Sequence, residues 1–102
     1  MGIVDFIIYL EQEKKTSKNT VEAYKRDIVA FESFLADRSV FAVTDASNAD
    51  VAAYMMELKE SGKSKATMNR KLSSIRAFYR YLLKNDAVKV NPTEDIKSPR
   101  VE

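Results

Sequence analysis

Apolar residues recur at helical spacing along most of the chain, and they predict four helices. In each of four segments, apolar side chains stand at intervals of three and four residues, which is typical of a helix with one buried face. The segments cover residues 2–14, 18–37, 48–60 and 65–84. The residues that mark their buried faces are Ile3, Phe6, Ile7 and Leu10; then Tyr24, Ile28, Phe31 and Leu35; then Ala49, Ala52, Ala53, Met56 and Leu58; and finally Met68, Leu72, Ile75, Tyr79 and Leu82.

The connecting segments predict a single all-α domain built as a helical bundle. Residues 39–48 form a loop, in which Val40, Phe41 and Val43 are expected to pack on the core. No stretch shows the alternation of a strand, and the first proline is Pro92. We expect the domain to cover residues 1–90. Residues 91–102 contain two prolines and predict a turn followed by the start of a linker.

Positive charge is concentrated in and around the fourth predicted helix. Residues 61–85 hold seven of the 17 basic residues and none of the 15 acidic ones. On a helical wheel, the face opposite the buried stripe carries no acidic partner three or four residues away, so external counter-ions are predicted. DNA supplies such counter-ions, and its major groove admits a helix. The exposed face consists of Asn69, Arg70, Ser73, Ala77, Arg80 and Lys84, with Ala66 beside them and Arg76 at its boundary.

In an alternative interpretation, acidic residues of the protein's own fold neutralise this positive charge. In that case the basic face would lie against the acidic residues Asp45, Asp50 and Glu57. A third possibility is that the basic helix docks an acidic protein partner. The sequence leaves these alternatives open.

The second and fourth helices begin with the same pattern, S-K-x-T, at Ser17 and at Ser64. Serine is a favoured N-cap, but lysine in the first turn opposes the helix dipole. An anion bound at each helix start would make that lysine favourable, because free N–H groups and the ammonium would converge on it. The alternative is two ordinary serine caps followed by solvated lysines.

The first helix carries apolar residues beyond its core stripe. Val4 and Ile8 lie on a second face, so this helix either lies deep in the bundle or contacts a second chain. We take Val4 and Ile8 as candidate subunit-interface residues.

Composition excludes several kinds of site. The chain has no cysteine and no histidine, and it has only two glycines, which leaves no thiolate metal site and no glycine-rich phosphate loop. The five tyrosines are interpreted as packing residues, because nothing obvious activates one of them as a nucleophile. We therefore expect no catalytic residue, metal, cofactor or small-molecule ligand. The N-terminus lacks a basic leader and a membrane-length apolar run, so a soluble, cytoplasmic chain without membrane contact is expected.

Three stretches resemble the N-terminal core-binding domain of tyrosine recombinases, the phage-integrase and Xer-type enzymes. They are NTVEAYKRDIVAFESFL from Asn19, SKATMNRKLSSIRAFYRYLLKN from Ser64, and NPTEDIKSP from Asn91. The resemblance implies a SAM-like bundle of four to five helices, joined by a linker to a separate catalytic domain that closes with it as a clamp around duplex DNA. It also implies contacts of the first helix with other recombinase protomers.

The resemblance implies a DNA-binding function for site-specific recombination or integration, without catalysis by this chain itself. A chain without histidine lacks the Arg-His pattern that the family uses for its chemistry. The docking of an acidic protein on the basic helix remains the alternative function. The candidate DNA-binding residues are Lys18, Thr20, Lys25, Lys65, Thr67, Asn69, Arg70, Ser73 and Arg80, together with the boundary residue Arg76.

Overall fold

A computed structural model describes residues 1–99 as four α-helices and one short 3₁₀ turn. The α-helices are α1 (Ile3–Gln12), α2 (Lys18–Asp37), α3 (Asn48–Glu60) and α4 (Lys65–Lys84). The 3₁₀ turn η1 (Val43–Asp45) lies in the loop between α2 and α3. The all-α prediction is confirmed, and α2, α3 and α4 have the predicted bounds. The first helix is shorter than predicted, because it ends at Gln12 rather than at residue 14.

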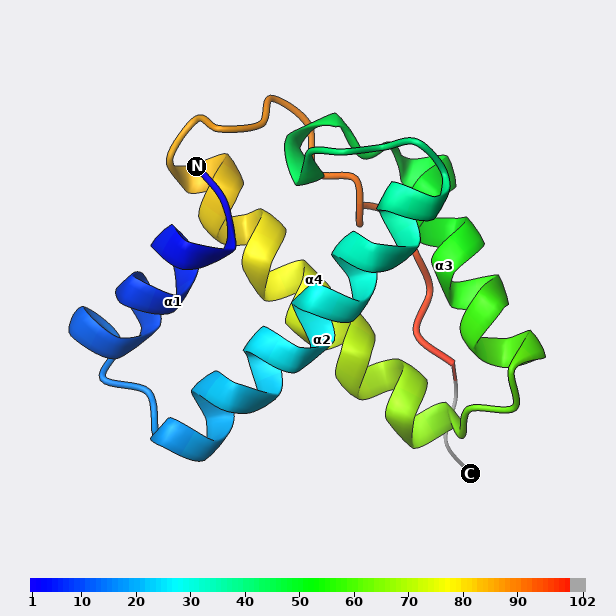
Figure 1. Cartoon of the computed structure of the whole chain (residues 1–102), viewed down its shortest axis with the longest axis horizontal. Coiled ribbons are helices and arrows are strands. Elements are labelled where there is room, and N and C mark those ends of the chain that lie inside the picture. The colour runs from blue at the N-terminus through cyan, green and yellow to red at the C-terminus, as the bar shows by residue number, and fades with distance from the viewer. Residues whose placement is uncertain (100–102) are drawn as a thin grey trace.

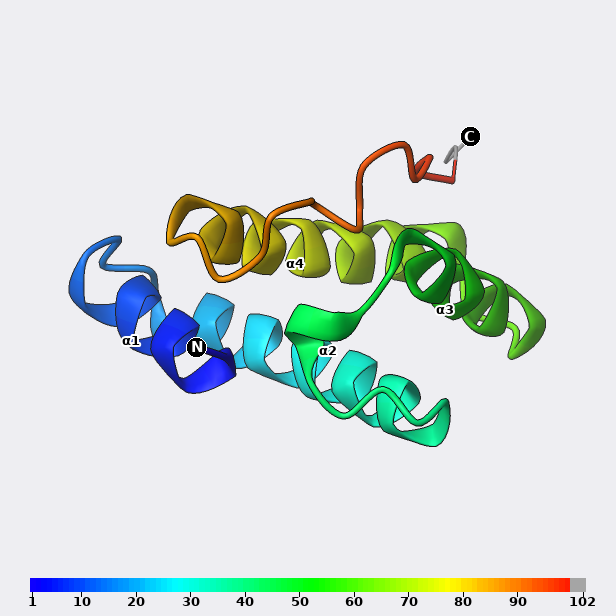
Figure 2. The same ribbon diagram turned by 90° about the horizontal axis from the view of Figure 1, so that it is seen from above.

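Helices α2 and α4 cross at the centre of the molecule, with α2 in front in Figure 1. Helix α1 packs against both of them at one end of the crossing, and α3 packs against both at the other. The view from above shows α2 and α4 in separate layers (Figure 2). The crossing therefore brings α2 and α4 together although they are far apart in the sequence.

The core fills the space between these helices. Phe6 of α1, Phe31 of α2 and Phe78 of α4 are almost completely buried. Tyr79 is also fully buried, and its hydroxyl donates a 2.7 Å hydrogen bond to the carbonyl of Val43, which fixes η1 on the core. Burial raises the pKa of Tyr79, so the hydroxyl keeps the proton that it donates. The packing interpretation of Tyr79 is confirmed.

Two predictions about buried positions were wrong. In α3 the buried apolar residues are Val51, Tyr54, Met55 and Leu58, whereas the predicted stripe member Met56 is 54% exposed. The observed set also has helical spacing and buries larger side chains than the predicted alanines. In the loop, Val43 is buried and Val40 half-buried as expected, but Phe41 is 83% exposed.

The chain after α4 folds back on the helices instead of leaving them. Residues 91–99, which we call the strap, run beside α4 toward its N-terminal end (Figure 1) and lie on the side of α4 away from α2 (Figure 2). Asn48 donates to the carbonyls of Pro92 at 3.1 Å and Glu94 at 2.7 Å. Thr93 is buried. The predicted linker 91–102 is thus packed on the domain over residues 91–99, and its last three residues lie outside the described part of the chain.

Candidate nucleic-acid interface

The starts of α2 and α4 have the same local structure. Ser17 accepts a hydrogen bond from the Thr20 N–H at 3.3 Å, and Ser64 accepts one from the Thr67 N–H at 3.1 Å. Each serine hydroxyl also donates to the threonine hydroxyl, at 2.9 and 3.0 Å. The predicted serine caps are confirmed. An anion at these starts stays a prediction.

The other two helices begin differently. The carboxylate of Asp5 accepts from the Gly2 N–H in α1, and that of Asp50 accepts from the Ser47 N–H in α3. Both carboxylates suit the positive end of the helix dipole. Helices α2 and α4 have no acidic residue in their first turns. Both of these starts point to the lower edge of the molecule in Figure 1, so the two uncompensated positive helix ends share one edge.

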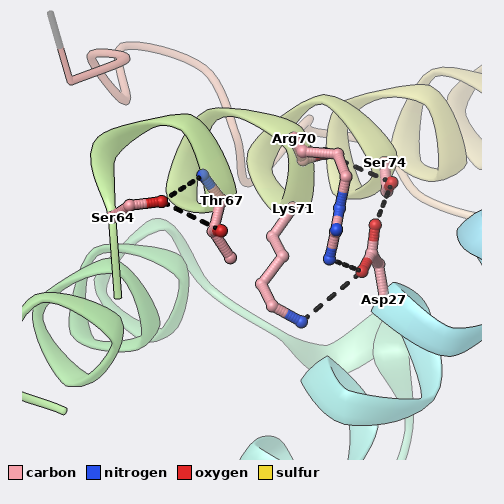
Figure 3. A network of polar contacts seen from close by, with 6 residues as sticks. All are labelled: Asp27, Ser64, Thr67, Arg70, Lys71 and Ser74. Carbon is pink, nitrogen blue, oxygen red and sulfur yellow. Dashed lines mark hydrogen bonds and ion pairs between the residues drawn. The ribbon is translucent and has the colours of Figure 1, made fainter. Parts of the chain in front are cut away.

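A fully buried carboxylate lies where α2 and α4 cross. Asp27 of α2 accepts hydrogen bonds from Arg70 Nη2 at 2.9 Å, Lys71 Nζ at 3.4 Å and Ser74 Oγ at 2.8 Å. Figure 3 shows the three α4 side chains converging on it. The prediction that the counter-ions of α4 all come from outside is therefore wrong for Arg70 and Lys71, whose counter-ion is Asp27.

Asp27 is not one of the acidic residues that were expected to lie against the basic face of the fourth helix. Asp50 pairs with Arg38 at 3.1 Å, and the Ser47 N–H, as the main cause, holds the pKa of Asp50 below its usual value. Within residues 1–99, neither Asp45 nor Glu57 forms an ion pair. The acidic residues proposed to neutralise α4 therefore do not do so in the described part of the chain.

A groove runs along the exposed side of α4, between it and the start of α2. Near the crossing, a hollow of about 190 Å³ is lined by Thr20, Arg70 and Ser73 above the buried Asp27. Farther along α4, a hollow of about 420 Å³ shares Thr20 and Tyr24 with the first and is also lined by Arg80. The additional cations that line the second hollow are Lys14 and Lys84.

This groove has the charge expected of an anion-binding surface. Its cations are Lys14, Arg70, Arg80 and Lys84, and its one carboxylate, Asp27, has no exposed surface. Between the cations lie the small residues Ser73 and Ala77, which allow a partner to approach the helix. Lys14, Tyr24 and Lys84 were not among the candidate DNA-binding residues, and only the approach of α1 to α2 and α4 places Lys14 here.

Two predicted residues, Asn69 and Arg76, face the strap instead of this groove. Asn69 Nδ2 donates to the Pro99 carbonyl at 2.8 Å. Arg76 donates to Ser98 Oγ at 3.0 Å and to the Ile96 carbonyl. One residue of the predicted exposed face and its boundary residue are thus bonded to the chain's own strap.

The three other predicted lysines lie outside this groove. Lys18, Lys25 and Lys65 are exposed, and none forms an ion pair within residues 1–99. Lys25 lies about 140° around α2 from Thr20, since each residue turns the helix by about 100°, so it does not line the groove.

The first helix has the exposed second face predicted for it. Val4 is 67% and Ile8 52% exposed, so the interpretation that buries this face deep in the bundle is wrong. The contact of this face with a neighbouring protomer stays a prediction.

Within residues 1–99, neither a metal site nor a membrane-spanning helix is found. Among residues 1–99, no three His, Cys, Asp or Glu side chains are grouped so that they could hold a metal ion. None of the helices in this range has the length and apolar character that would let it cross a membrane.

Comparison with known proteins identifies related sequences along nearly the whole chain. Residues 3–86 match the family described as phage integrase, N-terminal SAM-like domain. A putative tyrosine recombinase of Caldanaerobacter subterraneus is 37% identical over 98 residues, which is 96% of this chain and 33% of that protein. No solved structure matches the chain.

Two further relatives carry more specific names. The tyrosine recombinase XerC of Herpetosiphon aurantiacus is 32% identical over 95% of this chain and 32% of its own length. The tyrosine recombinase XerD of Oceanobacillus iheyensis is 34% identical over 97% of this chain and 34% of its own length. The chain thus spans about a third of the length of the curated relatives it matches.

Proposed function

Because this chain belongs to the phage integrase N-terminal SAM-like domain family, as the N-terminal core-binding domain of a tyrosine recombinase, we propose that it binds duplex DNA. In this proposal the domain is the non-catalytic half of a clamp that closes around the duplex during recombination or integration. The bond-breaking chemistry belongs to the part of the relatives that this chain does not match.

The observation that carries the proposal is the cationic groove between α4 and the start of α2. Four cations line it, and the single carboxylate beneath them is buried and already paired. Phosphate oxygens are the ligands that Lys and Arg bind at such surfaces, and most protein–DNA hydrogen bonds go to the backbone.

The residues have different roles in this proposal. Arg80, Lys84 and Lys14 contact phosphates along the groove. Lys18 and Lys65 contact phosphates at the two helix starts, where free N–H groups add to the attraction. Arg70 presents to the groove the donors that Asp27 does not use, either to a phosphate or to a base edge. Asn69 and Arg76 contact DNA only when the strap releases them.

Binding should be weak and sensitive to salt, because it relies on phosphate contacts. A dissociation constant of about 10⁻⁴–10⁻⁶ M is typical of contact without base readout at physiological salt. We expect fluorescence anisotropy of a labelled duplex to report binding at low salt that declines steeply as salt is added.

Arg80→Ala tests the groove directly. It should weaken binding to all duplexes alike and reduce the slope of log affinity against log salt by about 1, as expected for one lost phosphate contact. Lys59→Ala is the matched control, since Lys59 lies at the end of α3, away from the groove. Equal losses in the two variants, or no binding by the unmodified chain at low salt, would refute the proposal.

A further inference from the structure

A second groove, separate from the cationic groove above, lies between α3, the start of α4 and the end of the strap. These three elements meet at the lower right of Figure 1. The groove has a volume of about 490 Å³, which is in the range of clefts that take small ligands, about 300–1,000 Å³. It therefore has room for a few side chains of a partner.

The floor of this groove is made of methionine. Met55 and Met68 are buried beneath it, and Met56 is 54% exposed within it. Methionine side chains are flexible and polarisable, and they recur at surfaces that accept apolar side chains of varied shape. An exposed apolar surface of this kind, framed by polar residues, is typical of a binding site.

The rim of the same groove is positively charged throughout. Lys59, Lys63, Lys65 and Lys97 line it, and no acidic residue does. Within residues 1–99 none of these four lysines forms an ion pair. The lysine stems extend the apolar surface, while their ammonium groups remain available to a partner.

We propose that this groove docks an acidic amphipathic segment of a protein partner, in which apolar side chains are flanked by Asp or Glu. The methionine floor takes the apolar side chains, and the four ammonium groups pair with the carboxylates. A DNA backbone matches the rim but offers nothing to the floor, so the combination favours a peptide. This surface is additional to the DNA-binding function and shares only Lys65 with it.

The methyl signals of the four methionines report whether a peptide occupies the groove. We would label their methyl groups with ¹³C and titrate the protein with a short synthetic peptide of Glu and Asp that carries Leu or Phe at positions i, i+3, i+4 and i+7. The methyl signals of Met55, Met56 and Met68 should shift together. Met1 does not line the groove and should remain unchanged, so its signal is an internal control.

Substitutions test the methionine floor and the lysine rim separately. Met56→Gln and the double variant Lys59→Glu with Lys63→Glu change exposed positions, and each should weaken peptide affinity about tenfold or more. Phe41→Gln removes an exposed aromatic ring elsewhere and should have no effect. Arg80→Ala should leave peptide affinity unchanged while weakening DNA, whereas Lys59→Ala should do the reverse.

Three results would overturn the proposal. The first is the absence of shifts in the groove methyls up to the solubility limit of the peptide. The second is equal binding of a peptide in which Lys replaces Glu and Asp, or in which Ser replaces Leu and Phe. The third is a duplex DNA that shifts the methyls of Met55 and Met56 as strongly as the peptide does; a DNA-induced shift of Met68 alone is expected, because Lys65 in the same first turn contacts phosphate in the proposed function.

Discussion

At the scale of single residues, Asp27 links the packing of the fold to its surface charge. It is fully buried, yet it accepts hydrogen bonds from two cations and a hydroxyl of α4. A buried carboxylate is tolerated only when it is paired and hydrogen-bonded in this way. The same contact holds Arg70, whose side chain is 49% exposed, in one position at the groove.

Asp27→Asn should therefore destabilise the fold. We expect a loss of about 1.5–3 kcal/mol, the usual contribution of hydrogen bonds to charged groups. Arg70 can turn toward water, which limits the cost, whereas the side chain of Lys71 is only 12% exposed and places the expected loss at the upper end of this range. Urea unfolding should show a lower midpoint with an unchanged slope. Asp37→Asn, at the exposed end of α2, is the control and should stay within about 0.5 kcal/mol. Equal midpoints for the two variants would show that the Asp27 cluster adds no stability.

The charge balance of α4 could not be predicted from its own sequence. The periodicity of α4 correctly separates its buried face, but Asp27 lies 43 residues before Arg70. The pair exists only because α2 crosses α4 at that position. Likewise, Asn69 and Arg76 were expected at the exposed face and its boundary from their positions on the helical wheel, and the wheel does not show the strap that binds them, which follows α4 in the chain.

At the scale of secondary-structure elements, the helix starts were the most predictable part of the chain. Ser17 and Ser64 cap α2 and α4 as predicted, because serine accepts a hydrogen bond from a first-turn N–H. Ser47 caps α3 in the same way, although it was not among the predicted caps.

The buried face of α3 was mispredicted because two sets of apolar residues have helical spacing in it, one with Ala49, Ala52 and Ala53 and the other with Val51, Tyr54, Met55 and Leu58. Spacing alone does not show which face is buried. The large side chains of Tyr54 and Met55 decide it, because burying them removes more apolar surface from water.

The lysines at the starts of α2 and α4 should affect stability and DNA binding in opposite directions. Lys18→Glu and Lys65→Glu should each stabilise the fold by about 0.3–1 kcal/mol, because an acidic residue suits the positive end of the dipole. Both changes should weaken binding to duplex DNA. Thermal unfolding and anisotropy on the same samples would measure the two effects.

Lys59→Glu should have the opposite effect on the stability of the fold. Lys59 lies in the last turn of α3, where a cation is favourable, so this change should destabilise the fold and leave DNA affinity nearly unchanged. If Lys18→Glu and Lys65→Glu bind DNA as well as the unmodified chain, the helix starts do not contact phosphate.

At the scale of the whole molecule, the strap makes the last described residues part of the domain. Its backbone carbonyls accept hydrogen bonds from α3 and α4, through Asn48, Asn69 and Arg76. The spacing of apolar residues correctly predicted that the fourth helix ends at Lys84. The packing of residues 91–99 was not predictable, because it depends on side chains of two other helices.

Arg76→Met should loosen the strap without disturbing the core. The methionine keeps much of the bulk of the side chain but removes the donors to Ile96 and Ser98. Hydrogen exchange at the Ile96 amide should become faster, while exchange at the buried Leu82 should stay the same. Arg80→Met is the control, since no hydrogen bond joins Arg80 to the described part of the strap. Unchanged exchange at Ile96 in Arg76→Met would show that Arg76 does not hold the strap.

The proposed DNA contacts of Asn69 and Arg76 would compete with their bonds to the strap, which couples two events. Asn69 and Arg76 cannot donate the same hydrogen bonds to the strap and to a nucleic acid at one time. A duplex that draws these side chains outward must release the chain that they hold, and linkage requires the reverse as well. Tension applied at Pro99 would then change the affinity for DNA, so α4 would transmit mechanical load between the surface of the domain and the end of the strap.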